Sequence, residues 1–70
     1  MNRIASKENS PNRLLNAQQV AKYLNISKAM AYRLMQRGEL PCVRIGTAVR
    51  VRPADLSAYI DANLTTLSSL

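Results

Sequence analysis

The chain has 70 residues, and its ten lysines and arginines outnumber four acids to give a net charge of +6. A chain of this length allows one domain with a small core, and the positive charge favours a polyanionic partner. No apolar run is long enough to span a membrane and no secretory signal is present, so we expect a cytoplasmic protein without a membrane contact.

Catalytic and metal chemistry lacks its usual residues in this sequence. There is no histidine, and the four carboxylates are scattered along the chain. The single Cys42 excludes an internal disulfide and a structural zinc site, and we expect it to be buried in a strand. The two glycines are too far apart to form a phosphate-binding loop. We therefore expect no enzymatic activity, no metal and no cofactor.

The segment from Asn16 to Gly38 predicts two short helices joined by a tight turn, which is the outline of a helix-turn-helix. Asn16 can cap the first helix, and Gln19 completes a capping box. Asn25 tolerates the left-handed conformation that ends a helix. Ser27 then caps the second helix, which Gly38 ends. Apolar residues at helical spacing give each helix a core face: Ala17, Val20, Ala21 and Leu24 in the first, and Ala31, Leu34 and Met35 in the second.

The opposite face of the second helix carries no acid. It combines guanidinium, ammonium, amide, hydroxyl and small apolar groups, which are the groups that contact phosphates, base edges and thymine methyls in a major groove. The alternative interpretation is a solvated face of an ordinary amphipathic helix. The predicted recognition-helix contacts are Ser27, Lys28, Ala29, Met30, Tyr32, Arg33, Gln36 and Arg37.

The segment CVRIGTAVRVR alternates around a central turn and predicts a β-hairpin. A two-residue loop would mix apolar and charged side chains on each face, whereas a three-residue loop at 46–48 gives one apolar face, so we predict the second register. In that register Arg44 directly opposes Arg50. Two like charges that face each other across strands destabilise a hairpin. Contact of both arginines with a phosphate backbone would explain this arrangement. The alternative is that the two side chains simply extend away from each other into water.

A third helix is predicted to begin at Pro53, with Asp55 near its positive end. Exposure of its apolar face would favour a protein-interaction module, and burial against the first two helices would argue against one. The predicted organisation is a flexible arm at 1–13, a domain at 14–64 and a flexible tail at 65–70. The predicted buried face of this helix is Leu56, Tyr59, Ile60 and Leu64.

The chain from Leu14 to Ile60 resembles the excisionase-type winged helix-turn-helix domains, the recombination directionality factors of the MerR-like superfamily. The resemblance is carried by LLNAQQVAKYLNIS, KAMAYRLMQRGELP, VRIG and VRVRPADLSAYI. It implies a mostly α fold of three helices and a two-stranded wing, with the second helix in the major groove and the wing on the backbone or minor groove. Thr47-Ala48 replace the basic residues common at such wing tips, so the strand arginines are expected to act instead. The predicted wing contacts are Arg44, Thr47, Arg50 and Arg52.

The function that this resemblance implies is binding to specific double-stranded DNA. As an excisionase, the protein would bind repeated sites near an attachment site, bend the DNA and direct a recombinase (integrase) toward excision. As the alternative, it would be a small transcriptional regulator of a phage or mobile element. The three helices need their apolar faces for one another and the tail is too short for a zipper. We therefore expect a monomer in free solution that contacts neighbouring copies on DNA repeats.

Overall fold

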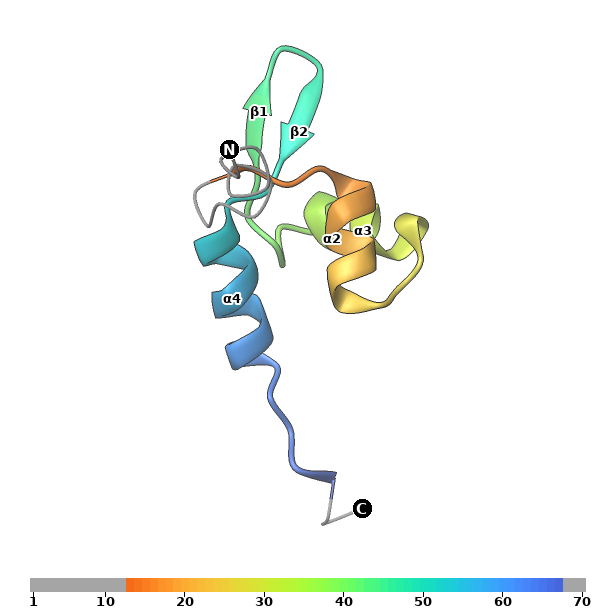
Figure 1. Cartoon of the computed structure of the whole chain (residues 1–70), viewed down its shortest axis with the longest axis vertical. Helices are drawn as coiled ribbons and strands as arrows, with labels where there is room; N and C mark the ends of the chain where they lie inside the picture. Colours follow the sequence, from red (N-terminus) through yellow and green to blue (C-terminus); the bar gives the residue numbers. More distant parts are fainter. Residues whose placement is uncertain (1–12, 68–70) are drawn as a thin grey trace, which may run out of the picture.

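The computed structural model describes residues 13–67, so the predicted arm lies almost wholly outside the described residues, as does the end of the predicted tail. Three helices and one antiparallel two-stranded hairpin form a winged helix-turn-helix, as the sequence predicts (Figure 1). The elements in chain order are α2 (Ala17–Leu24), α3 (Lys28–Gln36), β1 (Val43–Ile45), β2 (Ala48–Arg50) and α4 (Pro53–Ala62).

Helix α2 begins and ends through local hydrogen bonds. The backbone N–H of Gln19 donates to Asn16 Oδ1 at 2.8 Å, and the N–H of Asn16 donates to Gln19 Oε1 at 2.9 Å, so the predicted capping box is confirmed. Asn25 has φ 59° and ψ 48°, the predicted left-handed conformation. The N–H of Ile26 then donates to the carbonyl of Ala21 at 2.9 Å, which satisfies a carbonyl at the end of the helix.

Helix α3 follows three residues later with the same type of boundaries. Ser27 Oγ accepts the N–H of Met30 at 3.0 Å. Gly38 has φ +77°, a conformation that glycine adopts without a side-chain clash. The N–H of Glu39 donates to the carbonyl of Leu34 at 3.1 Å and closes the helix, as predicted for Gly38. These boundaries fix the length of the connection, which makes α2 and α3 cross (Figure 1).

The core lies between α2, α3 and the segments that follow them. Small residues, Ala21 and Ala31, are buried within it and leave room for close packing of the helix pair. The predicted apolar faces of α2 and α3 are confirmed, except that Leu24 is only half-buried. Leu40, which no helical pattern predicted, is fully buried just after α3. Within residues 13–67 the buried residues are Ala17, Val20, Ala21, Ala31, Leu34, Met35, Leu40, Val51 and Leu56.

The observed hairpin register differs from the predicted one. Ile45 pairs with Ala48 across a two-residue loop at 46–47, so Arg44 lies opposite Val49 and not opposite Arg50. The prediction of a three-residue loop with two opposed arginines was therefore wrong.

Two physical reasons explain this register. Gly46 has φ +62°, and a two-residue loop with glycine at its first position suits the twist of a hairpin. The hairpin also projects beyond the core (Figure 1), where Ile45 is 55% exposed. A clean apolar face is therefore not required near the tip, and the turn decides the register.

The base of the hairpin is fixed to the chain before α2. Leu15 and Val51 exchange both backbone hydrogen bonds, at 2.9 and 2.8 Å. Cys42 is exposed and precedes β1, so the prediction of a buried strand cysteine was wrong. Because Leu40 fills the core, the next two residues lie at the surface before the strand begins.

Helix α4 meets the core through Leu56 and Tyr59 but not through its last turn. Pro53 is its first residue and Leu56 is buried, as predicted, and Tyr59 is half-buried. Ile60 is 38% exposed and Leu64 is 83% exposed, so the predicted burial of these two was wrong. The helix runs away from the helix pair along the long axis of the molecule (Figure 1) and ends at Ala62, before Leu64. The exposed apolar side chains leave the protein-interaction alternative open.

Candidate nucleic-acid interface

The predicted recognition set lies on the exposed face of α3 and at its two cap residues, Ser27 and Arg37. The buried side of α3 packs into the core, as described above, and all eight predicted contact positions are exposed. The helix therefore divides into a core side and a solvent side at the positions that helical geometry predicts. Contact of these side chains with DNA stays a prediction.

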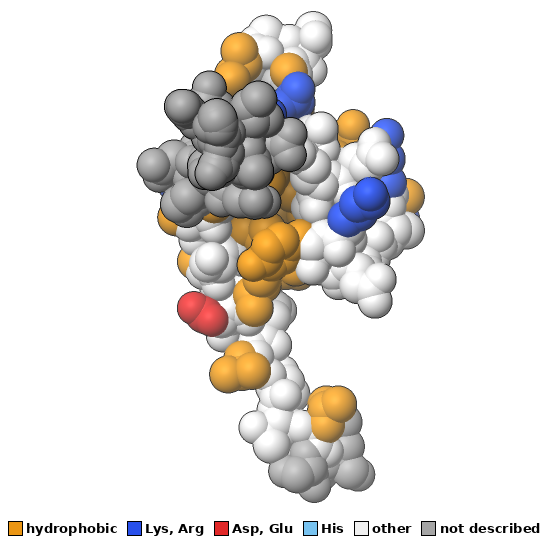
Figure 2. Space-filling model, in the orientation of Figure 1, with side chains coloured by type: hydrophobic (Ala, Val, Ile, Leu, Met, Phe, Trp, Pro, Cys, Tyr) orange, Lys and Arg blue, Asp and Glu red, His pale blue; other side chains and the backbone are white. Residues whose placement is uncertain are grey.

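The charges on this face are mostly uncompensated by acids of the described chain. Arg37 Nη1 lies 3.5 Å from Glu39 Oε2, but both side chains are about half exposed, at 57% and 47%, so the pair is weak. Lys28 and Arg33 have no ion pair within residues 13–67. Figure 2 shows basic side chains over the helix pair and near the hairpin, with few acidic side chains on the same face. This surface is suited to an anionic partner.

The wing arginines do not have the predicted arrangement, in which Arg44 and Arg50 are directly opposed. Arg44 is exposed and lies opposite Val49, whereas Arg50 lies opposite Val43. Since side chains alternate between the faces of a strand pair, Arg44 and Arg50 lie on different faces of the hairpin. Arg50 is half-buried, and its Nη1 donates to the carbonyl of Val49 at 2.9 Å. Thr47 is exposed in the loop, at the predicted wing tip.

Arg52 is held by a carboxylate at the start of α4. Its Nε donates to Asp55 Oδ2 at 2.6 Å and its Nη2 donates to Asp55 Oδ1 at 3.0 Å. These hydrogen bonds lower the pKa of the Asp55 carboxyl and raise the pKa of the Arg52 guanidinium. The pair connects the end of the wing to the first turn of α4. Unlike Arg44, Arg52 therefore has a charge that is already compensated within the chain.

The Arg52–Asp55 pair predicts a pH-dependent stability. Because the folded-state pKa of Asp55 lies below its ordinary value of about 3.9, the pair stabilises the fold above that value and loses its effect as the pH falls through the folded-state pKa. Asp55→Asn should therefore unfold at a lower temperature than the wild type at pH 7. The difference should shrink as both are measured at increasingly acidic pH.

Asp61→Asn is the matched control on the same helix, because Asp61 is exposed and makes no ion pair within the described residues. This variant should not lose stability at neutral pH. A difference between Asp55→Asn and the wild type that persists unchanged in acid would contradict the role of the ion pair.

Two exposed residues of α2 are further candidates for contact with DNA, although the sequence reasoning passed over them. Lys22 and Tyr23 occupy the last turn of α2, and Tyr23 is 67% exposed. In helix-turn-helix complexes the first helix crosses the DNA backbone, where an ammonium and a phenol hydroxyl can contact phosphate. Their position away from the buried face of α2 was the available signal.

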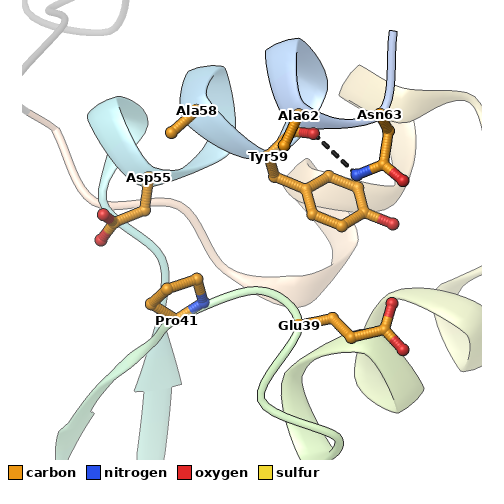
Figure 3. A pocket seen from close by; sticks show the side chains of 7 residues that line it. All are labelled: Glu39, Pro41, Asp55, Ala58, Tyr59, Ala62 and Asn63. Carbon is orange, nitrogen blue, oxygen red and sulfur yellow. Dashed lines mark hydrogen bonds between the residues drawn. The ribbon is translucent and has the colours of Figure 1, made fainter. Parts of the chain in front are cut away.

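A cavity of about 380 Å³ lies between α4 and the connection from α3 to β1 (Figure 3). Three of its polar side chains have partners within the chain: Asp55 binds Arg52, Glu39 lies near Arg37, and Asn63 Nδ2 donates to the carbonyl of Tyr59 at 2.8 Å. We assign it no ligand. The lining residues are Glu39, Pro41, Asp55, Ala58, Tyr59, Ala62 and Asn63.

The fold and the acid-free exposed face of α3 are those of a DNA-binding helix-turn-helix domain. Residues 14–64 match the helix-turn-helix domain family, and the chain belongs to that family. The residues that the structure describes contain no cluster of three side chains suited to holding a metal ion. None of the helices between residues 13 and 67 has the length and apolarity needed to cross a membrane.

The relatives are regulatory or DNA-binding proteins by name. The chain is 37% identical over 68 residues to the transcriptional repressor DcmR of Methylorubrum extorquens, a match that covers 94% of this chain and 26% of the repressor. It is 41% identical over 54 residues to MT0521 and Rv0500A of Mycobacterium tuberculosis, named as predicted DNA-binding proteins, with 70% of this chain and 69% of each relative covered. This chain thus spans about a quarter of the repressor. No solved structure gives a significant match.

Proposed function

We propose that the chain recognises a specific site in duplex DNA by inserting α3 into the major groove and placing the β1–β2 hairpin along the adjacent backbone. The observation that carries this proposal is the exposed, acid-free face of α3, in which cations stand beside amide and apolar groups. Cations position a protein on phosphates, whereas amide, guanidinium and apolar groups discriminate base edges. One face thus offers both kinds of contact.

Selection of bound duplexes from a random pool tests this proposal. The wild-type chain should enrich one recurring sequence, with an affinity at least about a thousandfold above that for random DNA. A variant with Lys28 and Arg33 both replaced by alanine should enrich no such sequence, because the proposed contacts are removed. The variant should still fold, since both residues are exposed and the change leaves the core intact. Enrichment of no sequence by the wild type would contradict specific recognition.

Transcriptional regulation at such a site is supported by the repressor relative, whose match extends over nearly the whole of this chain. Binding at a promoter would regulate transcription by excluding the polymerase. The resemblance to excisionase-type domains of the MerR-like superfamily supports the second duty, in which the protein bends DNA beside an attachment site and directs a recombinase toward excision. The two duties require the same DNA-binding surface and differ in where the site lies.

Two assays separate these duties. A reporter gene with the selected site in its promoter should be repressed by a regulator. An excision substrate with the site beside its attachment sequence, together with the integrase, should recombine faster when an excisionase is added. The location of the selected sites in the genome decides which promoter or attachment sequence is used. Repression without any effect on excision would overturn the excisionase proposal, and the reverse result would overturn the regulator.

Assembly on DNA is a separate part of the proposal. We expect a monomer in free solution and modest cooperativity between head-to-tail copies on direct repeats, since such contacts do not close into a dimer. Sedimentation of the free chain and gel shifts on DNA with one, two and three repeats measure both. A stable free dimer that requires an inverted repeat would contradict this arrangement.

Arg44 is expected to contact phosphate from the wing. Replacing it with alanine should weaken binding to specific and random DNA alike, and should reduce the salt slope of the affinity by about one. The melting temperature should hardly change because Arg44 is exposed. Arg52→Ala is the matched comparison: it should change the salt slope less and lower the melting temperature, because Arg52 is bound to Asp55. Equal salt slopes in the two variants would contradict the assignment of a phosphate contact to Arg44 and a structural role to Arg52.

A further inference from the structure

We infer that Met30 and Arg33 act together as one reading unit on α3, which recognises a guanine with a thymine directly beside it. This inference rests on the proposed specific binding and names the sequence that one part of the surface takes. The two residues stand three positions apart and therefore share a face of the helix. Arg33 Nη1 lies 3.9 Å from Met30 Sδ, so the two side chains are in contact in the free protein.

Met30 has no role in the core that would explain an apolar side chain at this position. It is 36% exposed, whereas Met35 on the other side of the same helix is 7% exposed. Ala29 beside it is also exposed, which extends the apolar patch. A patch of this kind on the solvent side of a DNA-binding helix is explained by contact with another apolar group.

Arg33 keeps its hydrogen-bonding capacity available. Among residues 13–67 no carboxylate pairs with it. A thioether sulfur is only a weak acceptor, so contact with Met30 limits the positions of the guanidinium without replacing a base as its partner. Lower mobility before binding reduces the conformational entropy that is lost on binding.

The chemistry of the two groups selects neighbouring bases. A guanidinium binds O6 and N7 of guanine by two hydrogen bonds, and an apolar side chain contacts the 5-methyl group of thymine. Adjacent bases in a strand are spaced by about 3.4 Å, which is similar to the 3.9 Å that separates the two side-chain atoms. Two groups in contact on the helix can therefore contact two adjacent base pairs.

The experiment removes single methyl groups from the DNA. In the site obtained by selection, the guanine read by Arg33 is identified as the one whose replacement by 7-deazaguanine, which lacks N7, weakens the wild type but not Arg33→Ala. Each thymine is then replaced in turn by deoxyuridine, which lacks only the 5-methyl group. Affinity is measured by fluorescence anisotropy for the wild type, Met30→Ala and Met30→Leu.

Deoxyuridine beside that guanine should weaken wild-type binding about fourfold, as expected when one buried methyl group is lost. Met30→Ala should bind the thymine site more weakly and respond little to deoxyuridine, whereas Met30→Leu should keep the response because it preserves an apolar contact. The wild type and both variants should unfold at similar temperatures, since Met30 is not part of the core.

Three results would overturn the inference while leaving specific binding intact. The first is a wild-type affinity that deoxyuridine beside the guanine does not change, and the second is a selected site with no thymine there. The third is an undiminished response to deoxyuridine in Met30→Ala, which would assign the methyl contact to another residue. If selection enriches no site at all, the proposed function fails and the inference fails with it, so the two failures are distinguishable.

Discussion

Replacing Leu40 with alanine should lower the free energy of unfolding by about 2–5 kcal/mol, the range measured when a large aliphatic side chain is truncated in a core. Leu40 is fully buried, and its backbone N–H donates to the carbonyl of Leu34 at 3.2 Å, so the surrounding chain cannot easily move in to fill the space. Stabilities of small domains are only about 5–15 kcal/mol. Urea unfolding followed by circular dichroism should therefore show a much lower midpoint.

Two variants make this prediction specific. Ile45→Ala removes a similar aliphatic side chain at the tip of the hairpin, where it is 55% exposed, and should change stability by no more than about 0.5 kcal/mol. Leu40→Met keeps the volume and should cost less than about 1.5 kcal/mol. If Leu40→Ala were no more harmful than Ile45→Ala, Leu40 would not be enclosed as the structure has it.

The helix pair could be predicted from the sequence because its signals are local. The hydrogen bonds of Asn16 with Gln19, and those that follow Asn25 and Gly38, all join residues within six positions of one another. Interactions of this kind depend on the neighbouring residues and hardly on the rest of the fold. The face of α3 that remains exposed also follows directly from helical geometry.

The hairpin and α4 were predicted less well because burial there depends on how far the core extends. The register argument assumed that one whole face of the hairpin is covered, whereas only its base meets the core at Val49 and Val51. Gly46, which favours a two-residue turn, was the better indicator of the hairpin register. In the same way, Leu56, Ile60 and Leu64 are spaced four residues apart and so predicted one apolar face of a helix. The core ends near Tyr59, however, so Ile60 and Leu64 stay exposed. A small core cannot bury every apolar residue whose burial the sequence pattern predicts.

The exposure of the predicted contact residues on α3 followed from the sequence, but the arrangement of the wing charges did not. All eight residues predicted on α3 and at its two caps are exposed, whereas the wing set divides between two faces of the hairpin and a residue bound to α4. The spacing of three between Arg52 and Asp55, at the start of a helix, was a usable signal for their ion pair. The separation of Arg44 from Arg50 depended on the register and could not be found without it.

Replacing Arg33 with alanine should weaken binding to the selected site by about 1–3 kcal/mol, which corresponds to about 5- to 150-fold in affinity. Arg33 is exposed in the second half of α3, and no carboxylate of the described chain pairs with it. Loss of the guanidinium removes two hydrogen bonds to one base edge and one unit of charge. Affinity for random DNA should fall much less, because there only the charge is lost. Titrations of both DNAs at the same salt concentration measure this ratio.

Arg37→Ala is the matched control, because it removes the same side chain from the residue directly after α3. Arg37 lies near Glu39, and its charge is partly compensated. We expect this variant to lose less affinity and to lose it equally on the selected site and on random DNA, as a phosphate contact would. Equal losses on both DNAs for Arg33→Ala would place Arg33 on the backbone as well. Base recognition by α3 would then have to depend on the amide of Gln36, the hydroxyl of Tyr32 and the apolar groups alone.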